Sequence, residues 1–155
     1  MNKHLIESLN KILTNTLDYK EVLQKLASSI SHRTTADKLD EFAKVCDREA
    51  KRLIKLIPDI GGQVESTERQ TDQEAVAWVS RPLPDTENMQ SILACLIEAE
   101  RNKENDYNTI LGHDSIDRET KNLLTKHRKE AESNLTYFQS AMQALESKVR
   151  NEPGS

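Results

Sequence analysis

Apolar residues recur along this chain in alternating steps of four and three, in four long stretches separated by polar or turn-forming segments. This spacing places them on one face of an α-helix, so each stretch predicts an amphipathic helix. The first two helices are expected over about residues 3–30 and 35–57. Their inward faces would be formed by Leu5, Leu9, Ile12, Thr16, Tyr19, Leu23, Leu26 and Ile30, and by Leu39, Ala43, Cys46, Ala50, Leu53 and Ile57.

The third and fourth helices are expected over about residues 86–111 and 116–149, with Gly112 ending the third. Pro58, followed by Gly61 and its neighbouring glycine, is expected to stop the second helix. Side chains that can cap a helix precede the second and third helices. The candidates are Thr34 or Thr35 for the second helix, and Asp85 or Thr86 for the third.

The segment 58–85 is long for a connection inside a compact domain. A crossover along the bundle would explain its length, because a helix of about 22 residues is about 33 Å long. Trp78, with Val76 and Val79, would then pack on the outside of the bundle, and the alternative is a loose loop with one apolar side chain. The pattern predicts a single all-α domain over residues 1–155, a four-helix bundle of two antiparallel hairpins joined by this crossover.

Composition and charge narrow the range of partners. Charged residues make up 31% of the chain, the net charge is −4, and basic and acidic residues are interspersed. Nucleic acid is therefore not an expected partner, and the absence of a long apolar run argues against a membrane span. Cys46 and Cys95 are isolated in apolar stretches, as is typical of reduced core thiols. We expect a cytoplasmic protein.

Two charged residues interrupt the inward face of the third helix. Its alternating steps run through Met89, Leu93, Leu96, Glu100, Lys103, Tyr107 and Ile110. Glu100 and His127 lie at similar distances from the turn at 112–115, so antiparallel neighbours would hold them at one height, near Tyr19. One hypothesis is a buried polar cluster in which Glu100 pairs with His127 or Lys103 and tyrosine hydroxyls complete the network. Another is that Lys103 extends its ammonium to solvent.

A third hypothesis is a di-metal carboxylate site built from Glu100, Glu104, His127 and Glu130. Such a site takes a glutamate from each of two helices and Glu-x-x-His from each of the other two. Oxygen and imidazole ligands suit iron or manganese. The second helix has no histidine, and the fourth carries the reversed order, His127-x-x-Glu130. We therefore expect no cofactor, with iron or manganese as the alternative.

Two pairs of short segments within the chain are similar, as expected if the two helical hairpins share one design. "LDYKEVL" (17–23) is similar to "NDYNTIL" (105–111), and "REA" (48–50) is similar to "KEA" (129–131). Chance similarity between amphipathic helices is the alternative explanation.

A resemblance to a known family rests on Asp18-Tyr19, on Trp78 in the crossover, and on Glu98-x-Glu100-Arg101 followed by Tyr107. With the hairpin–crossover–hairpin layout, residues 3–148 resemble an uncharacterised bacterial family of ferritin-like four-helix-bundle proteins, carried as a domain of unknown function. The resemblance implies a ferritin-like arrangement with the second and third helices parallel, and it implies no activity. Ferritin-like relatives that bind two metals carry paired Glu-x-x-His motifs, from which this sequence departs.

The expected function is therefore non-enzymatic, with no predicted catalytic or cofactor-binding residue. We expect the bundle to bind a protein partner or to form a homo-oligomer, using an exposed strip around Trp78. The residues predicted to contribute to interaction or to a polar core are Trp78, Tyr19, Glu100, Lys103, Tyr107 and His127. The resemblance adds a stress-related role, since small ferritin-like proteins often have one. The alternative is a di-metal iron or manganese protein with oxidase or metal-storage activity.

Overall fold

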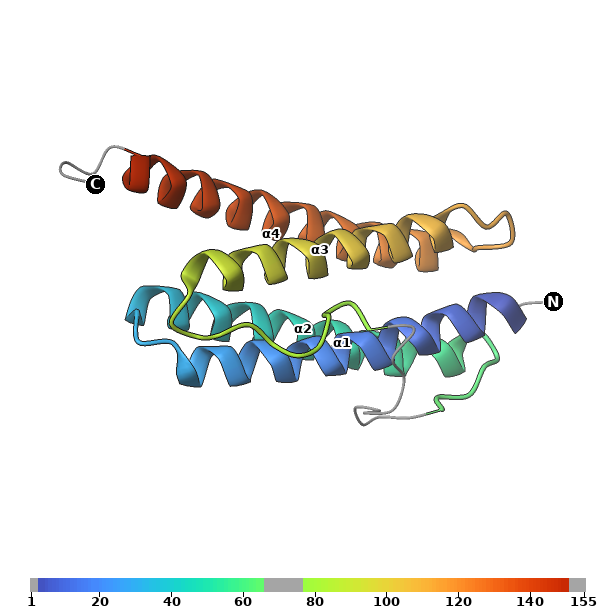
Figure 1. Ribbon diagram of the computed structural model, residues 1–155. Coiled ribbons are helices and arrows are strands. Elements are labelled where there is room, and N and C mark those ends of the chain that lie inside the picture. The colour runs from blue at the N-terminus through green and yellow to red at the C-terminus, as the bar shows by residue number, and fades with distance from the viewer. Residues whose placement is uncertain (1–2, 66–76, 151–155) are drawn as a thin grey trace.

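The computed structural model describes residues 3–65 and 77–150, which contain four α-helices (Figure 1). The helices are α1 (Lys3–Ser29), α2 (Arg33–Asp59), α3 (Met89–Leu111) and α4 (Arg118–Arg150). Within these described residues the chain forms helices, turns and irregular connections, with no strand. The prediction of an all-α chain with four helices is confirmed, and the helix limits differ from the predicted ones by a few residues.

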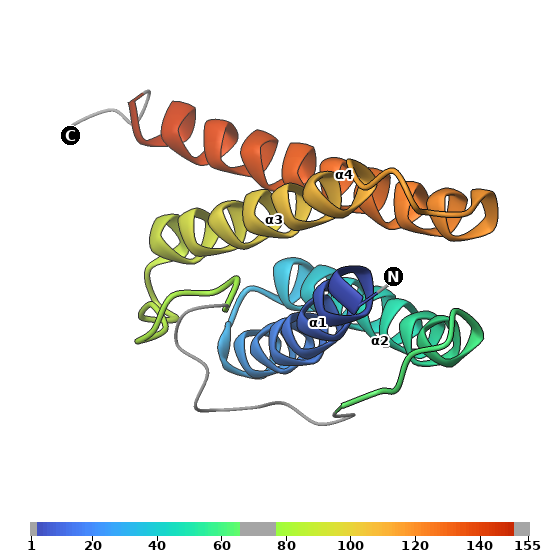
Figure 2. The same ribbon diagram turned by 90° about the vertical axis from the view of Figure 1, so that its right-hand side faces the viewer.

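The four helices form two layers. α1 and α2 lie side by side in one layer, and α3 and α4 lie side by side in the other (Figures 1 and 2). Short links join the helices within each layer, whereas the connection from α2 to α3 is long. Residues 77–88 of this connection run in front of α1 toward the beginning of α3 (Figure 1). The space between the two layers is where inward-facing side chains of different helices meet.

The N-terminal caps of α2 and α3 differ from the predicted ones. His32 caps α2, since its Nδ1 accepts the backbone N–H of Thr35 at 3.3 Å. Asn88 caps α3, and its side-chain oxygen accepts the N–H of Ser91 at 3.1 Å. The predicted caps are wrong because each region offers several neighbouring acceptors, and the backbone conformation selects one of them. The rejected candidates are Thr34, Thr35, Asp85 and Thr86.

The end of α2 lies slightly beyond the predicted stop. The helix includes Pro58 in its last turn, where the missing N–H costs only one intrahelical hydrogen bond. Gly61 then turns the chain with a φ of 88°, in the left-handed region that favours glycine. Gly62 lies so close to α1 that a Cβ on it would come 2.8 Å from the side chain of Ile6. The two glycines therefore let the connection leave α2 while staying packed on α1.

The predicted inward faces of the first two helices are buried, with no residue more than 8% exposed. In α4, Leu124, Ala131 and Phe138 are buried, while Leu135, Met142 and Leu145 are half-buried. The side chain of Val149 lies outside the described residues. The apolar periodicity thus identified the packed faces, and burial weakens toward the end of α4.

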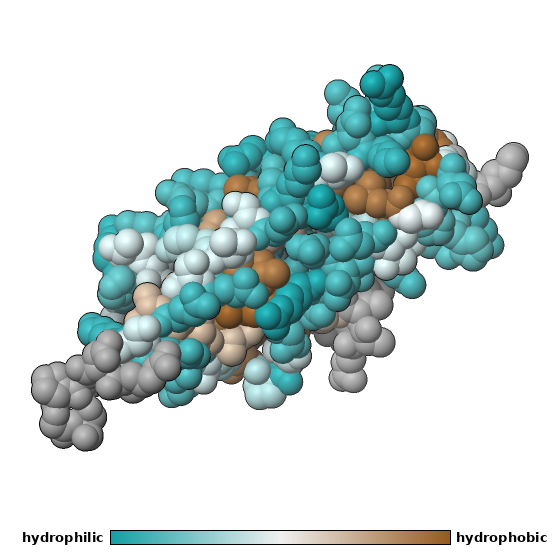
Figure 3. Space-filling view, turned by 90° about the horizontal axis from the view of Figure 1, so that it is seen from above, coloured by the Kyte–Doolittle hydropathy of each residue, from teal (hydrophilic) through white to brown (hydrophobic). Residues whose placement is uncertain are grey.

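The face seen from above, over α3 and α4, is mostly hydrophilic, with small separate apolar patches (Figure 3). None of the helices in the described ranges is long and apolar enough to cross a membrane.

Candidate functional site

A cluster of polar side chains lies in the interior of the protein. Six of them have no exposed surface, and we call them the buried ionic cluster. They are Tyr19 on α1, Glu49 on α2, Glu100, Lys103 and Tyr107 on α3, and His127 on α4. Burial of charged groups is expensive unless each has a partner, so their contacts decide what the cluster can do.

Lys103 forms an ion pair with Glu49 in this cluster. Its Nζ donates to Glu49 Oε1 at 2.5 Å, and neither side chain is exposed. The ammonium also lies 5.8 Å from the ring centre of Trp78. Burial disfavours the charged form of Lys103, but its interactions with Glu49, Cys46, Glu100 and Tyr107 together outweigh burial and raise the pKa of Lys103 well above the usual value. The hypothesis that Lys103 reaches solvent is wrong, because a carboxylate is available to it inside the protein.

Glu100 is held by two uncharged groups. The hydroxyl of Tyr19 donates to Glu100 Oε2 at 2.6 Å, and the Asn134 amide donates to the same oxygen at 3.5 Å. Neither of the two partners considered for Glu100, His127 or Lys103, forms a pair with it, because the tyrosine from α1 reaches the carboxylate across the layers. Burial raises the pKa of Glu100, although the charge of Lys103 opposes this shift.

His127 is held as a neutral ring. Its Nδ1 lies 3.0 Å from the hydroxyl of Tyr107, and its Nε2 lies 3.4 Å from a guanidinium nitrogen of Arg52. Because Arg52 can only donate, Nε2 accepts and Nδ1 carries the proton. Burial, together with the positive charges of Lys103 and Arg52, lowers the pKa of His127 to about 3.

Glu49 and Glu130 form a carboxyl pair between α2 and α4. Each side chain shifts the pKa of the other through a hydrogen bond that can form only when one of the two carboxyl groups is protonated. Burial raises the pKa of Glu49 to about 8, against the charge of Lys103. Burial also opposes ionisation of Glu130, but the hydrogen bond from Glu49 and the charges of neighbouring cations lower its pKa. Glu130 is partly exposed, and its Oε1 lies 3.8 Å from Arg52.

Several carboxylate oxygens in this region have no donor. They are Glu49 Oε2, Glu100 Oε1, Glu104 Oε2 and Glu130 Oε2. A proton shared between Glu49 and Glu130 accounts for Glu49 Oε2 and Glu130 Oε2, since a protonated carboxyl group is itself a donor. Glu100 and Glu104 each keep one buried oxygen without a partner. The cluster therefore carries more acceptors than donors.

The sequence-based predictions omitted Glu49 and Arg52. Glu49 immediately precedes Ala50, which belongs to the predicted inward face. Arg52 comes three residues after Glu49, so both side chains lie beside that face. The similarity between "REA" (48–50) and "KEA" (129–131) was the available signal, because it aligns Glu49 with Glu130. These two glutamates are the ones that pair in the structure.

Three of the four residues proposed as metal ligands have separate partners. Glu100 contacts Tyr19, His127 contacts Tyr107, and Glu130 contacts Glu49. In the part of the chain that the structure describes, no group of three or more His, Cys, Asp or Glu side chains is arranged to hold a metal ion. Lys103 also brings a positive charge into the same cluster, which disfavours a di-metal centre there.

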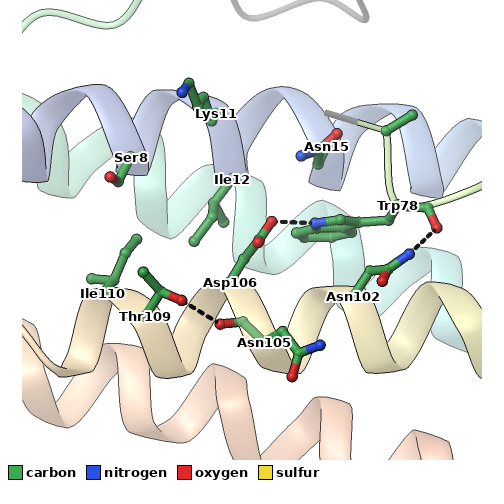
Figure 4. Close-up of a pocket in the computed structure, with 11 residues that line it drawn as sticks. Ser8, Lys11, Ile12, Asn15, Trp78, Asn102, Asn105, Asp106, Thr109 and Ile110 are labelled. Carbon is green, nitrogen blue, oxygen red and sulfur yellow. Dashed lines mark hydrogen bonds between the residues drawn. The ribbon is translucent and has the colours of Figure 1, made fainter. Parts of the chain in front are cut away.

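Trp78 closes the cluster on the α1–α3 side instead of forming an exposed strip. It is 2% exposed and Val79 is 1% exposed, so the predicted outer position is wrong. The indole N–H donates to Asp106 Oδ2 at 2.7 Å, and the Asn102 amide donates to the Trp78 carbonyl at 2.9 Å (Figure 4). An indole can be buried in this way because its single donor has an acceptor. Val76, expected to join this strip, lies outside the described residues.

The two Asp-Tyr pairs have equivalent roles. Tyr19 and Tyr107 both point into the core, where each hydroxyl contacts a charged or titratable group. The aspartates that precede them bind the 77–88 segment, since Asp18 lies 2.8 Å from Arg81 and Asp106 accepts from Trp78. The similarity between residues 17–23 and 105–111 therefore corresponds to a shared way of fixing the connection on the bundle.

In comparisons with known proteins, no family model matches this chain and no curated protein is similar to it. The chemistry of the buried ionic cluster is therefore the basis on which a function can be argued.

Proposed function

We propose that this protein is a non-enzymatic, cytoplasmic, ferritin-like four-helix bundle of two antiparallel hairpins joined by a long crossover. Lys103, rather than a metal ion, supplies the positive charge beside the buried carboxylate of Glu49. The protein acts through its surface, by binding a protein partner or a second copy of itself. The observation that carries the proposal is the Lys103–Glu49 ion pair, in which neither side chain is exposed.

An internal ammonium supports a structural role for the cluster. A metal centre between carboxylates requires the positive charge to come from the ion, and a lysine in the same place repels it. Lys103 also donates directly to Glu49, so this carboxylate is already engaged. A satisfied buried ion pair of this kind fixes the register of packed helices, which a stable interaction scaffold needs.

The closed surroundings of the cluster argue against catalysis there. Catalytic groups in enzymes usually line a pocket that the substrate can enter. Glu49, Glu100 and Lys103 have no exposed surface, and His127 is enclosed beside them. The two free cysteines, Cys46 buried and Cys95 half-buried, are compatible with a reducing cytoplasm. A non-enzymatic role is the one that these side chains support best.

The experiment is metal analysis of protein purified from cells grown with added iron and manganese. We expect no stoichiometric metal, and no rise in melting temperature when manganese, iron or zinc is added to the purified protein. About two metal ions per chain, lost in Glu100→Ala, would overturn the proposal. Glu41→Ala is the matched control, because it removes an exposed carboxylate outside the cluster.

A di-metal iron or manganese protein with oxidase or storage activity remains the second candidate. One observation favours it, namely that Glu100 and Glu104 each have one buried carboxylate oxygen without a donor. Glu49 adds a carboxylate from α2 that the sequence-based ligand set did not contain. The same metal analysis separates the candidates, since only this one requires bound metal that depends on Glu100.

A further inference from the structure

A pocket of about 480 Å³ lies between α1 and α3, beside Trp78 (Figure 4). This volume falls within the range of pockets that hold small molecules. Its lining includes the apolar side chains of Ile12 and Ile110 and the polar side chains of Asn15 and Asp106. No member of the buried ionic cluster lines it, so it is distinct from the site described above.

Asn15 is a largely buried polar residue that lines this pocket. Its side chain is 3% exposed, yet its amide has no hydrogen-bond partner among the described residues. The polar atoms of Asn15 are not among the fully buried side-chain atoms that lack a partner, so they stay accessible from the pocket. Because Asn15 lines the pocket, a ligand there could supply the missing hydrogen bonds.

Asp106 gives the pocket a negative charge. Trp78 Nε1 donates to its Oδ2 at 2.7 Å, which fixes the orientation of the carboxylate. No lysine or arginine of the described residues forms an ion pair with it. Lys11 also lines the pocket, but it is exposed, and in Figure 4 its ammonium points away from Asp106. A positively charged ligand would therefore complete this wall of the pocket.

We propose that the pocket binds a small aliphatic amine. In Figure 4, Asn15 projects from α1 and Asp106 from α3 toward the gap that holds the indole of Trp78. The ligand's ammonium donates to the Asp106 carboxylate and to the amide oxygen of Asn15, while its methylene groups pack on Ile12 and Ile110. The overall net charge of −4 further favours the approach of a cation.

Calorimetric titration with putrescine, a linear aliphatic diamine, tests this proposal on the 155-residue chain. Butanediol and succinate are the matched probes, since they have a similar length but carry no charge or negative charge. We expect one putrescine per chain and no binding of the other two. Trp78, the single tryptophan, reports the same event by fluorescence, because its N–H contacts the carboxylate that binds the amine.

Asp106→Asn keeps an acceptor for Trp78 and removes the charge, so we expect it to weaken putrescine binding at least about tenfold. Asp114→Asn, which removes an exposed charge elsewhere, should leave binding unchanged. Circular dichroism verifies that both variants are folded, and Asn15→Ala gives a second test that leaves Trp78 untouched. The proposal is overturned if putrescine does not bind, if butanediol or succinate binds equally well, or if Asp106→Asn binds as tightly as the unmodified protein.

Discussion

Replacing Glu49 with glutamine would remove a proton-binding group from the buried ionic cluster while preserving the shape of the side chain. In the protein, burial raises the pKa of Glu49 from 4.5 to about 8. Between these values the folded state holds a proton that the unfolded state has lost. The free energy of unfolding must therefore fall as pH rises through this interval, and this contribution is lost above the folded pKa.

The magnitude follows from the size of the interval. One pH unit corresponds to about 1.4 kcal/mol, and about 1.5 units separate pH 6.5 from the folded pKa of Glu49. Stability should thus decrease by roughly 2 kcal/mol between about pH 6.5 and pH 8.5. The pKa of His127 is lowered from 6.5 to about 3, so this residue makes the free energy of unfolding rise with pH. That rise falls mainly between these two pKa values, below the pH range used for Glu49. The Glu49 effect is therefore best seen on the alkaline side.

Urea denaturation at a series of pH values, followed by fluorescence of Trp78, measures this dependence. In Glu49→Gln the amide oxygen can still accept from Lys103 and the amide nitrogen can donate to Glu130, so the decrease should disappear. Glu41→Gln removes an exposed carboxylate of the same helix and should retain the decrease. Equal slopes in the unmodified protein and in Glu49→Gln would refute the assignment of the proton to Glu49.

Other variants test the remaining contacts of the cluster by denaturation. Lys103→Met should destabilise the protein by about 3–5 kcal/mol, because it leaves buried carboxylates without their cation, and adding Glu49→Gln should recover part of this loss. If the destabilisation of the double variant equals the sum of the two single effects, Lys103 and Glu49 do not form an ion pair. Trp78→Ala should cost about 3–5 kcal/mol without changing the oligomeric state measured by light scattering, since the side chain is 2% exposed. A change in assembly would mean that this region forms an interface. Tyr19→Phe should cost about 1–3 kcal/mol by removing the donor to Glu100, and a neutral effect would show that another donor replaces it.

The fold could be predicted because helix formation and burial depend on local periodicity. The four-three steps identified the inward faces of α1 and α2 almost completely, and they placed Glu100 and Lys103 in the interior of α3. A charged residue in the middle of an otherwise apolar face must be buried once the helix packs. The sequence of α3 alone was therefore enough to predict that a polar cluster exists.

The partners inside the cluster depended on tertiary structure. Whether Lys103 meets Glu49 or Glu100 is decided by the rotation and height of α2 and α3, which no local pattern specifies. Glu49 lies beside the predicted inward face and is buried because a helix in a bundle contacts more than one neighbour. Trp78 is buried because Asp106, distant in sequence, accepts its N–H. Periodicity along one helix determined which face turned inward, while the pairing of charges required the positions of all four helices.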